Sequence, residues 1–223
     1  MKKKFLIAGI LGVAFIWLAV ILRTVDVAPT GLEDTKIGLS TINMGVHNFF
    51  GVHKIWDQIT DGFVAAAIAI AATYAVMGVV QLVKRKSIKK VDIELKLLAG
   101  LYAVMAFFYL LFEKVVVINY RPVFEDDGTL ESSFPSTHTL AACVLLWSAA
   151  ILVLKYRNKC WWRATLVVCC IAASLVISVG RIFAGVHWLT DVLGGYLLSG
   201  ALVLAFWGLI DYFNKKKHHH KKA

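Results

Sequence analysis

The chain has 223 residues, of which 59% are hydrophobic and 17% are charged, and its mean hydropathy is +0.72. Soluble globular domains are about half apolar and a quarter charged, so this composition excludes an ordinary water-soluble protein and predicts an integral membrane protein. The formal charge of +10 is typical of proteins that contact nucleic acid or anionic lipid, and also of membrane proteins with a defined orientation.

Six predominantly apolar segments follow one another along the chain, each near the length that a bilayer-spanning helix needs. They lie at 5–22, 63–83, 97–112, 140–154, 166–182 and 193–210. We therefore expect an all-α membrane protein with six transmembrane helices in one bundle, and a single membrane domain over residues 1–223. The first segment follows three lysines, as in a signal peptide, but it lacks a small-residue cleavage site, so we expect it to remain as a span.

The 23–61 segment between the first two spans is too polar to cross a membrane, yet its apolar residues recur at nearly helical spacing. They are Ile42, Val46, Phe49, Phe50, Ile55, Trp56 and Ile59. This pattern predicts a short amphipathic helix on the membrane interface, with Trp56 as an anchor. Two roles are open for such a helix: a cap over the bundle, and a guide for lipid.

The basic residues are divided unevenly between the two sides of the predicted bundle. The N-terminus, the 84–96 and 155–163 loops and the basic tail at 214–223 hold 18 of the 24 Lys and Arg residues. We expect the protein to lie in the plasma membrane or the inner membrane of the cell. Because cytoplasmic loops are enriched in Lys and Arg, we expect both termini and these loops on the cytoplasmic side. The loops at 23–61, 113–139 and 183–192 are then extracytoplasmic. The positive charge thus indicates orientation, and we expect no nucleic-acid partner.

Polar residues gather in three of the segments predicted on the outer face. In the first, Lys114 and Arg121 lie seven residues apart, close to two helical turns, so on a helix both would project from one face. An Arg fork together with a Lys point charge suits a phosphate group. The alternative interpretation is a pair of cations that snorkel at a helix end.

The second segment, at 134–139, comes directly before the fourth span. Ser136 or Thr139 can cap the helix, and the free amides of a helix N-terminus attract anions. Capping alone does not account for His138, the one histidine of this loop.

The third segment holds Arg181, His187 and Asp191. His187 and Asp191 are four residues apart, so on a helix the carboxylate would lie one turn from the imidazole, where it can fix the tautomer and raise the basicity of the ring. Such a pair serves nucleophilic catalysis, although a purely structural hydrogen bond has the same spacing. Ionisable groups at the ends of spans are costly, so the conjunction of all three segments favours function.

Together the three segments resemble the signature of the type 2 phosphatidate phosphatase superfamily of membrane lipid phosphatases. The matching motifs are Lys114-x6-Arg121-Pro122, Pro135-Ser136-x-His138 and Arg181-x5-His187-x3-Asp191. Two positions depart from the usual pattern: Thr137 stands where the second motif has Gly, and Gly180 stands where the third motif begins with Ser. We expect these departures to weaken phosphate binding or alter selectivity and to leave the mechanism intact.

The resemblance implies hydrolysis through a phosphohistidine. His187 is then the nucleophile, Asp191 stabilises its imidazolium, and His138 protonates the leaving oxygen and later activates water. The phosphate would be held by Lys114, Arg121, Ser136, Arg181 and the amides of Thr137 and His138. Because three cations stabilise the phosphate, the resemblance implies no metal and no other cofactor. We interpret the acidic 125–131 segment as a solvated loop.

The sequence therefore predicts an integral membrane phosphatase that hydrolyses the phosphomonoester or pyrophosphate of a lipid at the outer leaflet. By the resemblance, candidate substrates are undecaprenyl pyrophosphate, phosphatidylglycerol phosphate and phosphatidate. Two alternatives stay open. One is a phosphotransferase that passes the phosphoryl group to an acceptor other than water, and the other is a non-catalytic lipid-phosphate binder or transporter with a degenerate site. Nothing in the sequence indicates an oligomeric state.

Overall fold

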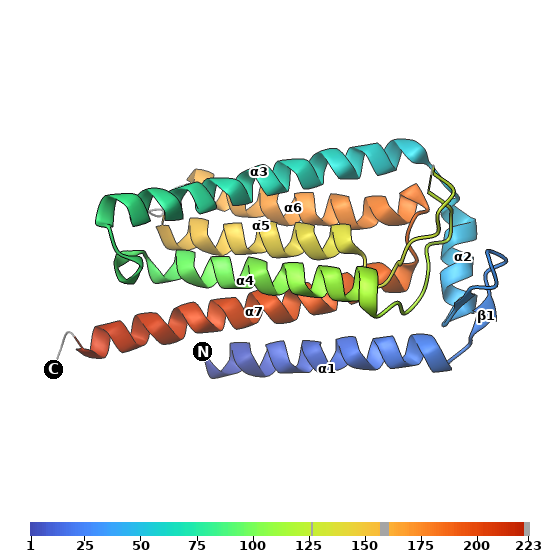
Figure 1. The fold of residues 1–223 in the computed structure, drawn as a ribbon, viewed down its shortest axis with the longest axis horizontal. Coiled ribbons are helices and arrows are strands. Elements are labelled where there is room, and N and C mark those ends of the chain that lie inside the picture. Colours follow the sequence, from blue (N-terminus) through green and yellow to red (C-terminus); the bar gives the residue numbers. More distant parts are fainter. Residues whose placement is uncertain (126, 157–160, 221–223) are drawn as a thin grey trace.

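The computed structural model describes residues 1–125, 127–156 and 161–220, and most of them form long helices that lie side by side (Figure 1). The helices are α1 (Lys2–Thr24), α2 (Ser40–Phe50), α3 (Lys54–Arg85), α4 (Ile93–Leu110), α5 (Thr137–Tyr156), α6 (Trp161–Ala184) and α7 (Leu189–His220). Three minor features join them. A 3-10 turn, η1 (Ile88–Lys90), precedes α4, a π-helical turn, η2 (Leu111–Val115), continues it, and β1 (Ala28–Pro29) pairs antiparallel with β2 (Lys36–Ile37).

Six of the described helices are long and apolar enough to cross a membrane, which confirms the predicted number of spans. They are α1, α3, α4 with η2, α5, α6 and α7 up to Lys216. Large apolar side chains face outward along them: Ile10, Trp17 and Val83 are between 58% and 68% exposed. An apolar outer surface of this extent suits lipid, and helices satisfy their backbone hydrogen bonds internally, as a span must.

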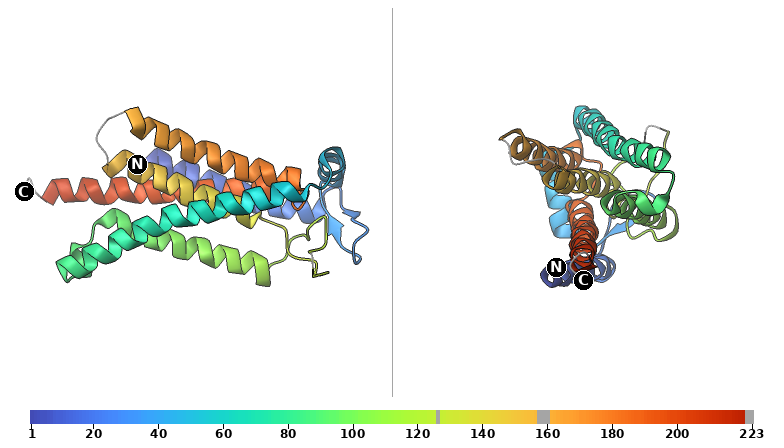
Figure 2. Two further views of the ribbon diagram at one scale, coloured as in Figure 1. Left: turned by 90° about the horizontal axis from the view of Figure 1, so that it is seen from above. Right: turned by 90° about the vertical axis from the view of Figure 1, so that its left-hand side faces the viewer.

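Helix α5 is the centre of the bundle, and α3, α4, α6 and α7 pack around it (Figure 2, right). In its most apolar stretch 67% of the residues are buried, against 11% in α3 and 17% in α1. Small side chains such as Ala142, Cys143 and Ala149 make this possible, because they let the neighbouring helices approach closely. The residues at the N-terminus of α5 are therefore held by the whole bundle.

The predicted amphipathic helix is confirmed in its first half and wrong in its second. Helix α2 lies across one end of the bundle (Figure 1), but it ends at Phe50 because Gly51 has a positive φ of 72°. Trp56 belongs to the first turn of α3 instead, and its ring packs 5.4 Å from that of Phe183 in α6. The second span thus begins at Lys54, well before the predicted 63–83 segment.

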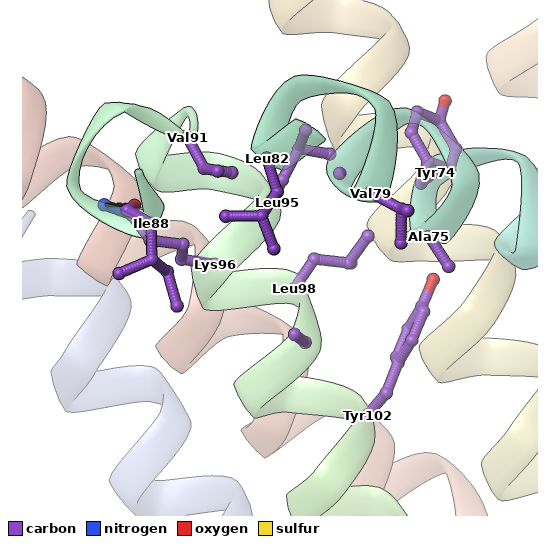
Figure 3. A pocket seen from close by; sticks show the side chains of 12 residues that line it. Tyr74, Ala75, Val79, Leu82, Ile88, Val91, Leu95, Lys96, Leu98 and Tyr102 are labelled. Carbon is purple, nitrogen blue, oxygen red and sulfur yellow. Dashed lines mark hydrogen bonds between the residues drawn. The ribbon is translucent and has the colours of Figure 1, made fainter. Parts of the chain in front are cut away.

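We call the end of the bundle that carries α2 the α2 end, and the end that carries both termini the terminal end (Figure 1). Much of the predicted basic tail at 214–223 is helical, because α7 continues to His220. The described residues do not include 221–223 of this tail or 157–160 of the predicted 155–163 loop. An apolar cavity of about 320 Å³ lies between α3 and α4 beside η1 at the terminal end, lined by Leu82 and Leu98 among others (Figure 3).

The α4–α5 loop is fixed to the bundle by Phe134. Its ring is 1% exposed and stacks on Phe15 of α1 with 5.4 Å between the ring centroids. It also lies directly against Gly194 of α7, where an added Cβ would come within 2.4 Å of Phe134 Cε2. A glycine at 194 is therefore needed for the loop to reach its place.

We expect Gly194→Ala to destabilise the protein, although alanine is normally the better helix former by about 1 kcal/mol. The added methyl group overlaps a ring that is held on both sides, and overpacking of this kind costs about 1–3 kcal/mol. The midpoint of thermal unfolding in detergent should fall by several degrees. Gly12→Ala in α1 is the matched control, because no heavy atom lies within 4 Å of its Cβ position. Equal midpoints for the two variants would contradict the predicted overlap.

Candidate functional site

The three polar segments of the sequence meet at the α2 end. Arg121 lies in the α4–α5 loop, His138 in the first turn of α5, Arg181 near the end of α6, and His187 in the turn that joins α6 to α7. The helix order brings together residues that are more than 60 positions apart, because α5 and α7 both begin at this end (Figure 2, left).

His187 is held from one side by a buried polar network. Its Nδ1 lies 3.1 Å from Ser133 Oγ and 3.5 Å from Asp191 Oδ2. Ser133 also donates a short hydrogen bond to Asp191, and Asn119 Nδ2 donates to Asp191 Oδ1 over 3.0 Å. The four side chains belong to residues that are at most 3% exposed. The imidazole ring therefore has a fixed orientation.

The same network fixes the tautomer of His187. A serine hydroxyl has one proton, and Ser133 donates it to the Asp191 carboxylate, so Ser133 Oγ can only accept from His187. The proton of a neutral His187 consequently resides on Nδ1. Its Nε2 then carries a lone pair and, within the described part of the chain, has no hydrogen-bond partner. This is the arrangement that a nucleophilic imidazole needs.

The pKa of His187 is well below the usual value of 6.5 for histidine, first because the ring is buried and next because Arg181 and Arg121 are nearby cations. Both effects penalise the imidazolium. His187 is therefore neutral at pH 7, with its lone pair available.

The prediction that His187 and Asp191 share a helix is wrong, although the two side chains do meet. His187 precedes α7, which begins at Leu189, and Asp191 lies in the first turn of that helix. There the Asp191 carboxylate accepts the backbone N–H of Trp188 over 2.8 Å, as an acidic group at a helix N-terminus commonly does. Asp191 thus anchors both the turn and the imidazole.

Arg181 is 1% exposed and is neutralised by α3. Its Nη1 forms a short ion pair with Asp57, lies 3.2 Å from Thr60 Oγ1 and lies 3.6 Å from Asp61 Oδ1. Asp61 also contacts the second histidine, because its Oδ1 lies 2.9 Å from His138 Nε2. Two carboxylates one helical turn apart therefore face the predicted phosphate-binding groups.

Ser136 caps α5, as one interpretation of the sequence held. Its Oγ accepts the backbone N–H of Thr139 over 3.4 Å and the Thr139 hydroxyl over 3.2 Å, while its own N–H donates to Asp191 O over 3.0 Å. Thr137 is the first residue of α5, where backbone N–H groups have no partner inside the helix. The amides of Thr137 and His138 thus point out of the helix start.

Arg121 is also occupied by carboxylates. It forms a short ion pair with Glu125, and its Nη2 lies 2.9 Å from Glu131 Oε2. These two residues of the segment interpreted as a solvated loop thus remain 34% and 37% exposed and also pair with Arg121. Among the described residues, no group of three or more His, Cys, Asp or Glu has an arrangement that could hold a metal ion.

Lys114 and Arg121 do not project from one helix face, contrary to the prediction. The helix ends with η2 at Val115, and Arg121 follows in an extended stretch whose N–H donates to Glu131 O over 3.0 Å. The Lys114 side chain is 70% exposed, and its Nζ lies 3.5 Å from Glu113 Oε1. The structure thus brings Arg121 and Arg181 to the histidines and leaves Lys114 directed toward Glu113.

Four ring and guanidinium nitrogens at this site are buried without a hydrogen-bond partner in the described chain. They are Arg121 Nε, Arg181 Nε, His138 Nδ1 and His187 Nε2. Buried polar atoms are nearly always satisfied, so such a concentration indicates a place for a ligand. Two of the four, the Nε–H groups of Arg121 and Arg181, are cationic donors suited to an anion.

The third motif usually begins with serine, and packing explains why this chain has Gly180 there instead. A Cβ at this position would come within 2.5 Å of Thr60 Cγ2 and 3.4 Å of the Trp56 ring, so a serine would collide with α3. Ser178 does not replace the missing hydroxyl, because it turns away and donates to Ser174 O over 2.8 Å. This agrees with the expectation that Ser178 faces elsewhere on the helix.

Five residues of the site were not predicted from the sequence: Ser133, Asn119, Asp57, Thr60 and Asp61. The first two lie within a few residues of recognised motif positions, and an unexplained polar residue beside a motif was the available signal. The other three had no such signal, because α3 lies outside the motifs and meets Arg181 only through the fold.

Comparison with known proteins agrees with this geometry. A family model, the PAP2 superfamily, matches residues 97–215, which include the three motifs. A dihydrosphingosine 1-phosphate phosphatase from Schizosaccharomyces pombe is 31% identical over 99 residues, which are 42% of this chain; the chain thus matches only 23% of the length of that relative.

Among solved structures, the chain resembles a transmembrane PAP2-type phosphatidylglycerolphosphate phosphatase from Bacillus subtilis. The TM-score is 0.66 at 16% sequence identity, and the match covers 92% of this chain and 96% of that one. At this identity the likeness concerns the fold. The family match, which spans more than half of the chain, decides the assignment: the protein belongs to the PAP2 superfamily.

Proposed function

We propose that the protein is a membrane lipid phosphatase that works through a phosphohistidine on His187. The observation that carries this proposal is the Nε2 atom of His187, whose ring is oriented by Ser133 and Asp191. Within the described chain this atom has no hydrogen-bond partner, and the site also holds buried arginine and histidine nitrogens that lack one. The membership of the PAP2 superfamily supports the phosphatase class.

In the first step, the Nε2 lone pair attacks phosphorus and the bond from phosphorus to the lipid oxygen breaks. His138 gives its proton to that oxygen, so the lipid leaves as an alcohol, or as a monophosphate when the substrate is a pyrophosphate. The positive charge that forms on His187 is stabilised by Asp191 through Nδ1–H. In the second step, His138 takes a proton from water, which attacks phosphorus and releases inorganic phosphate from His187.

The phosphate oxygens are proposed to bind Arg121, Arg181, Ser136 and the amides of Thr137 and His138, which would stabilise the charge of the transition state. Lys114 is proposed to join them by rotating its long, exposed side chain away from Glu113. The backbone amide of Thr137 keeps the donor that a glycine would offer, so the departure at this position removes conformational freedom only.

The α2 end is proposed to face the outside of the cell. The connection between α3 and α4 and the N-terminal lysines lie at the terminal end and are strongly basic, which favours a cytoplasmic location for that end. A lipid head group would then reach the site from the outer leaflet, with its chains among the helices. Candidate substrates are undecaprenyl pyrophosphate, phosphatidate, and the lipids named for the two relatives, phosphatidylglycerolphosphate and dihydrosphingosine 1-phosphate.

Removal of the nucleophile should abolish activity. Purified protein is expected to release phosphate from at least one of these lipids in detergent or nanodiscs, and His187→Ala should lower the rate by about a thousandfold or more, as loss of a nucleophile does. With a lipid labelled on its phosphate, the wild type should yield a labelled, acid-labile phosphoenzyme that the variant lacks. His53→Asn, at an exposed histidine of the same end, is the control and should retain activity. Unchanged turnover in His187→Ala would exclude this nucleophile, and a phosphorylated second acceptor in place of free phosphate would indicate a phosphotransferase.

Activity should not depend on a metal ion. Arginines and amides are proposed to supply the charge that a metal would otherwise supply, so phosphate release should be the same after dialysis against EDTA. The comparison needs the same lipid, the same detergent and a readdition of Mg²⁺. A loss of rate that Mg²⁺ restores would contradict the proposal.

The acid limb of the pH profile should lie below the usual range of histidine. A lowered pKa keeps His187 neutral, and hence nucleophilic, as the pH falls below 6.5, and activity is lost only when the pH passes the lowered value. The measurement is kcat/KM against pH, divided by the fraction of substrate in its dianionic form. A decline of the corrected rate centred at 6.5 or above would show that His187 is not the group described here.

A further inference from the structure

Carboxylates already occupy the cations that are proposed to hold phosphate. In the described chain, Arg181 contacts Asp57 and Asp61, and Arg121 contacts Glu125 and Glu131. We call Asp57 and Asp61 the α3 carboxylate pair; they lie four residues apart on α3 and so face the same side. Their side chains are 39% and 58% exposed, whereas that of Arg181 is 2% exposed, so a ligand can reach the carboxylates directly.

The α3 carboxylate pair is at the site because of a feature of this chain. Gly180 lets Thr60, which is completely buried between the pair, lie in the space that a Cβ at position 180 would take. A residue larger than glycine would push α3 away from Arg181. The glycine at position 180, where the third motif usually has serine, thus allows the two carboxylates to lie beside Arg181.

These carboxylates make the site electrostatically unfavourable for a simple phosphate dianion. Two guanidinium groups face four carboxylates, so an incoming phosphate must bind beside negative groups that remain nearby. Like charges held this close together repel each other, and the repulsion is stronger at a protein surface than in bulk water. A substrate that brings its own positive charge beside the phosphate avoids this repulsion.

The position of Asp61 says where that charge would lie. Asp61 Oδ1 is 2.9 Å from Nε2 of His138, the residue proposed to protonate the leaving oxygen. Asp61 is therefore on the leaving-group side, next to the first atoms of the lipid. Only the imidazole ring of His138 separates Asp61 from the leaving oxygen, so an ammonium group bound to Asp61 would lie close to the ester oxygen along the lipid.

The unpartnered nitrogens give an independent sign of a ligand at this place. Arg181 is 1% exposed and His187 is 3% exposed, and each has a buried nitrogen without a hydrogen-bond partner in the described chain. These nitrogens would meet the phosphate of a ligand, and the α3 carboxylate pair would bind a cationic group next to that phosphate.

We propose that Asp57 and Asp61 form an ammonium-binding subsite, and that the protein prefers lipid phosphates with a primary amine close to the phosphate ester oxygen. This inference rests on the proposed phosphatase function. Asp61 receives the ammonium group, and Asp57, which keeps its ion pair with Arg181, strengthens the negative potential around it. Lipid phosphates without an amine are poorer substrates because they leave the pair uncompensated.

The test compares two lipids that differ only in charge: a long-chain 2-amino-1-alkyl phosphate and its N-acetyl derivative. For the wild type, kcat/KM should be at least about tenfold higher for the amine, which corresponds to about 1.4 kcal/mol. Asp61→Asn should bring the ratio close to one, chiefly by lowering kcat/KM for the amine, and Asp57→Asn should lower it in part. Glu33→Gln makes the same change of charge at an exposed position of the α2 end and should leave the ratio unchanged.

Binding of both lipids to the His187→Ala protein in nanodiscs separates this inference from the proposed function. If the wild type hydrolyses neither of these two lipids nor any of the candidate substrates named above, the phosphatase proposal fails, and a preference for binding the amine that Asp61→Asn removes would still support the subsite. Any of three results would overturn the subsite. The first is the same ratio of kcat/KM for the amine and its N-acetyl derivative in wild type and variants. The second is an equal loss of kcat for both lipids in Asp61→Asn, which would make Asp61 a positioning residue for His138, and the third is a faster reaction of both lipids in the variants, which would mean that the carboxylates only compete with phosphate.

Discussion

A buried guanidinium group has to be neutralised, and the arrangement of the α2 end follows from how Arg181 meets this requirement. Among the described residues that are at most 1% exposed, Arg181 has the largest side chain. A buried charge without a partner costs several kcal/mol, so Asp57 and Thr60 of α3 must lie against it. This contact fixes where α3 enters the bundle. Burial lowers the pKa of His187, and the same cation lowers it further, so the imidazole stays neutral. One ion pair thus links the packing of α3 with the chemical state of the histidine.

The spans could be predicted from the sequence because apolar runs of sufficient length have few other uses. Their limits were less accurate, since polar residues such as Asp57 and Asp61 extend α3 outward beyond its apolar part. The periodicity from Ile42 to Ile59 also continues across Gly51, so it concealed the break between α2 and α3. Spacing alone does not reveal that η2 ends the helix between Lys114 and Arg121.

At the site, motif residues were predictable and their partners were not. The i, i+4 spacing correctly paired His187 with Asp191, but the pair spans the start of a helix instead of lying within one. Ser133, which decides the tautomer of His187, is 54 residues away in sequence, and Asp57 is 124 residues from Arg181. Such contacts depend on how whole helices pack, and a single sequence carries no local signal for them.

The pairing of α1 with α7 has a consequence for how the protein is made. Helix α1 packs mainly on α7, where Gly200 and Gly208 receive Leu11 and Phe5, and Lys4 forms an ion pair with Asp211 over 2.7 Å. A ribosome synthesises α1 before α7, because α1 precedes α7 in the chain. The first helix must therefore wait in the membrane without its principal neighbour until the rest of the chain has been inserted. The bundle closes late in synthesis, and the α4–α5 loop, which Phe134 ties to both α1 and α7, is completed at that same moment.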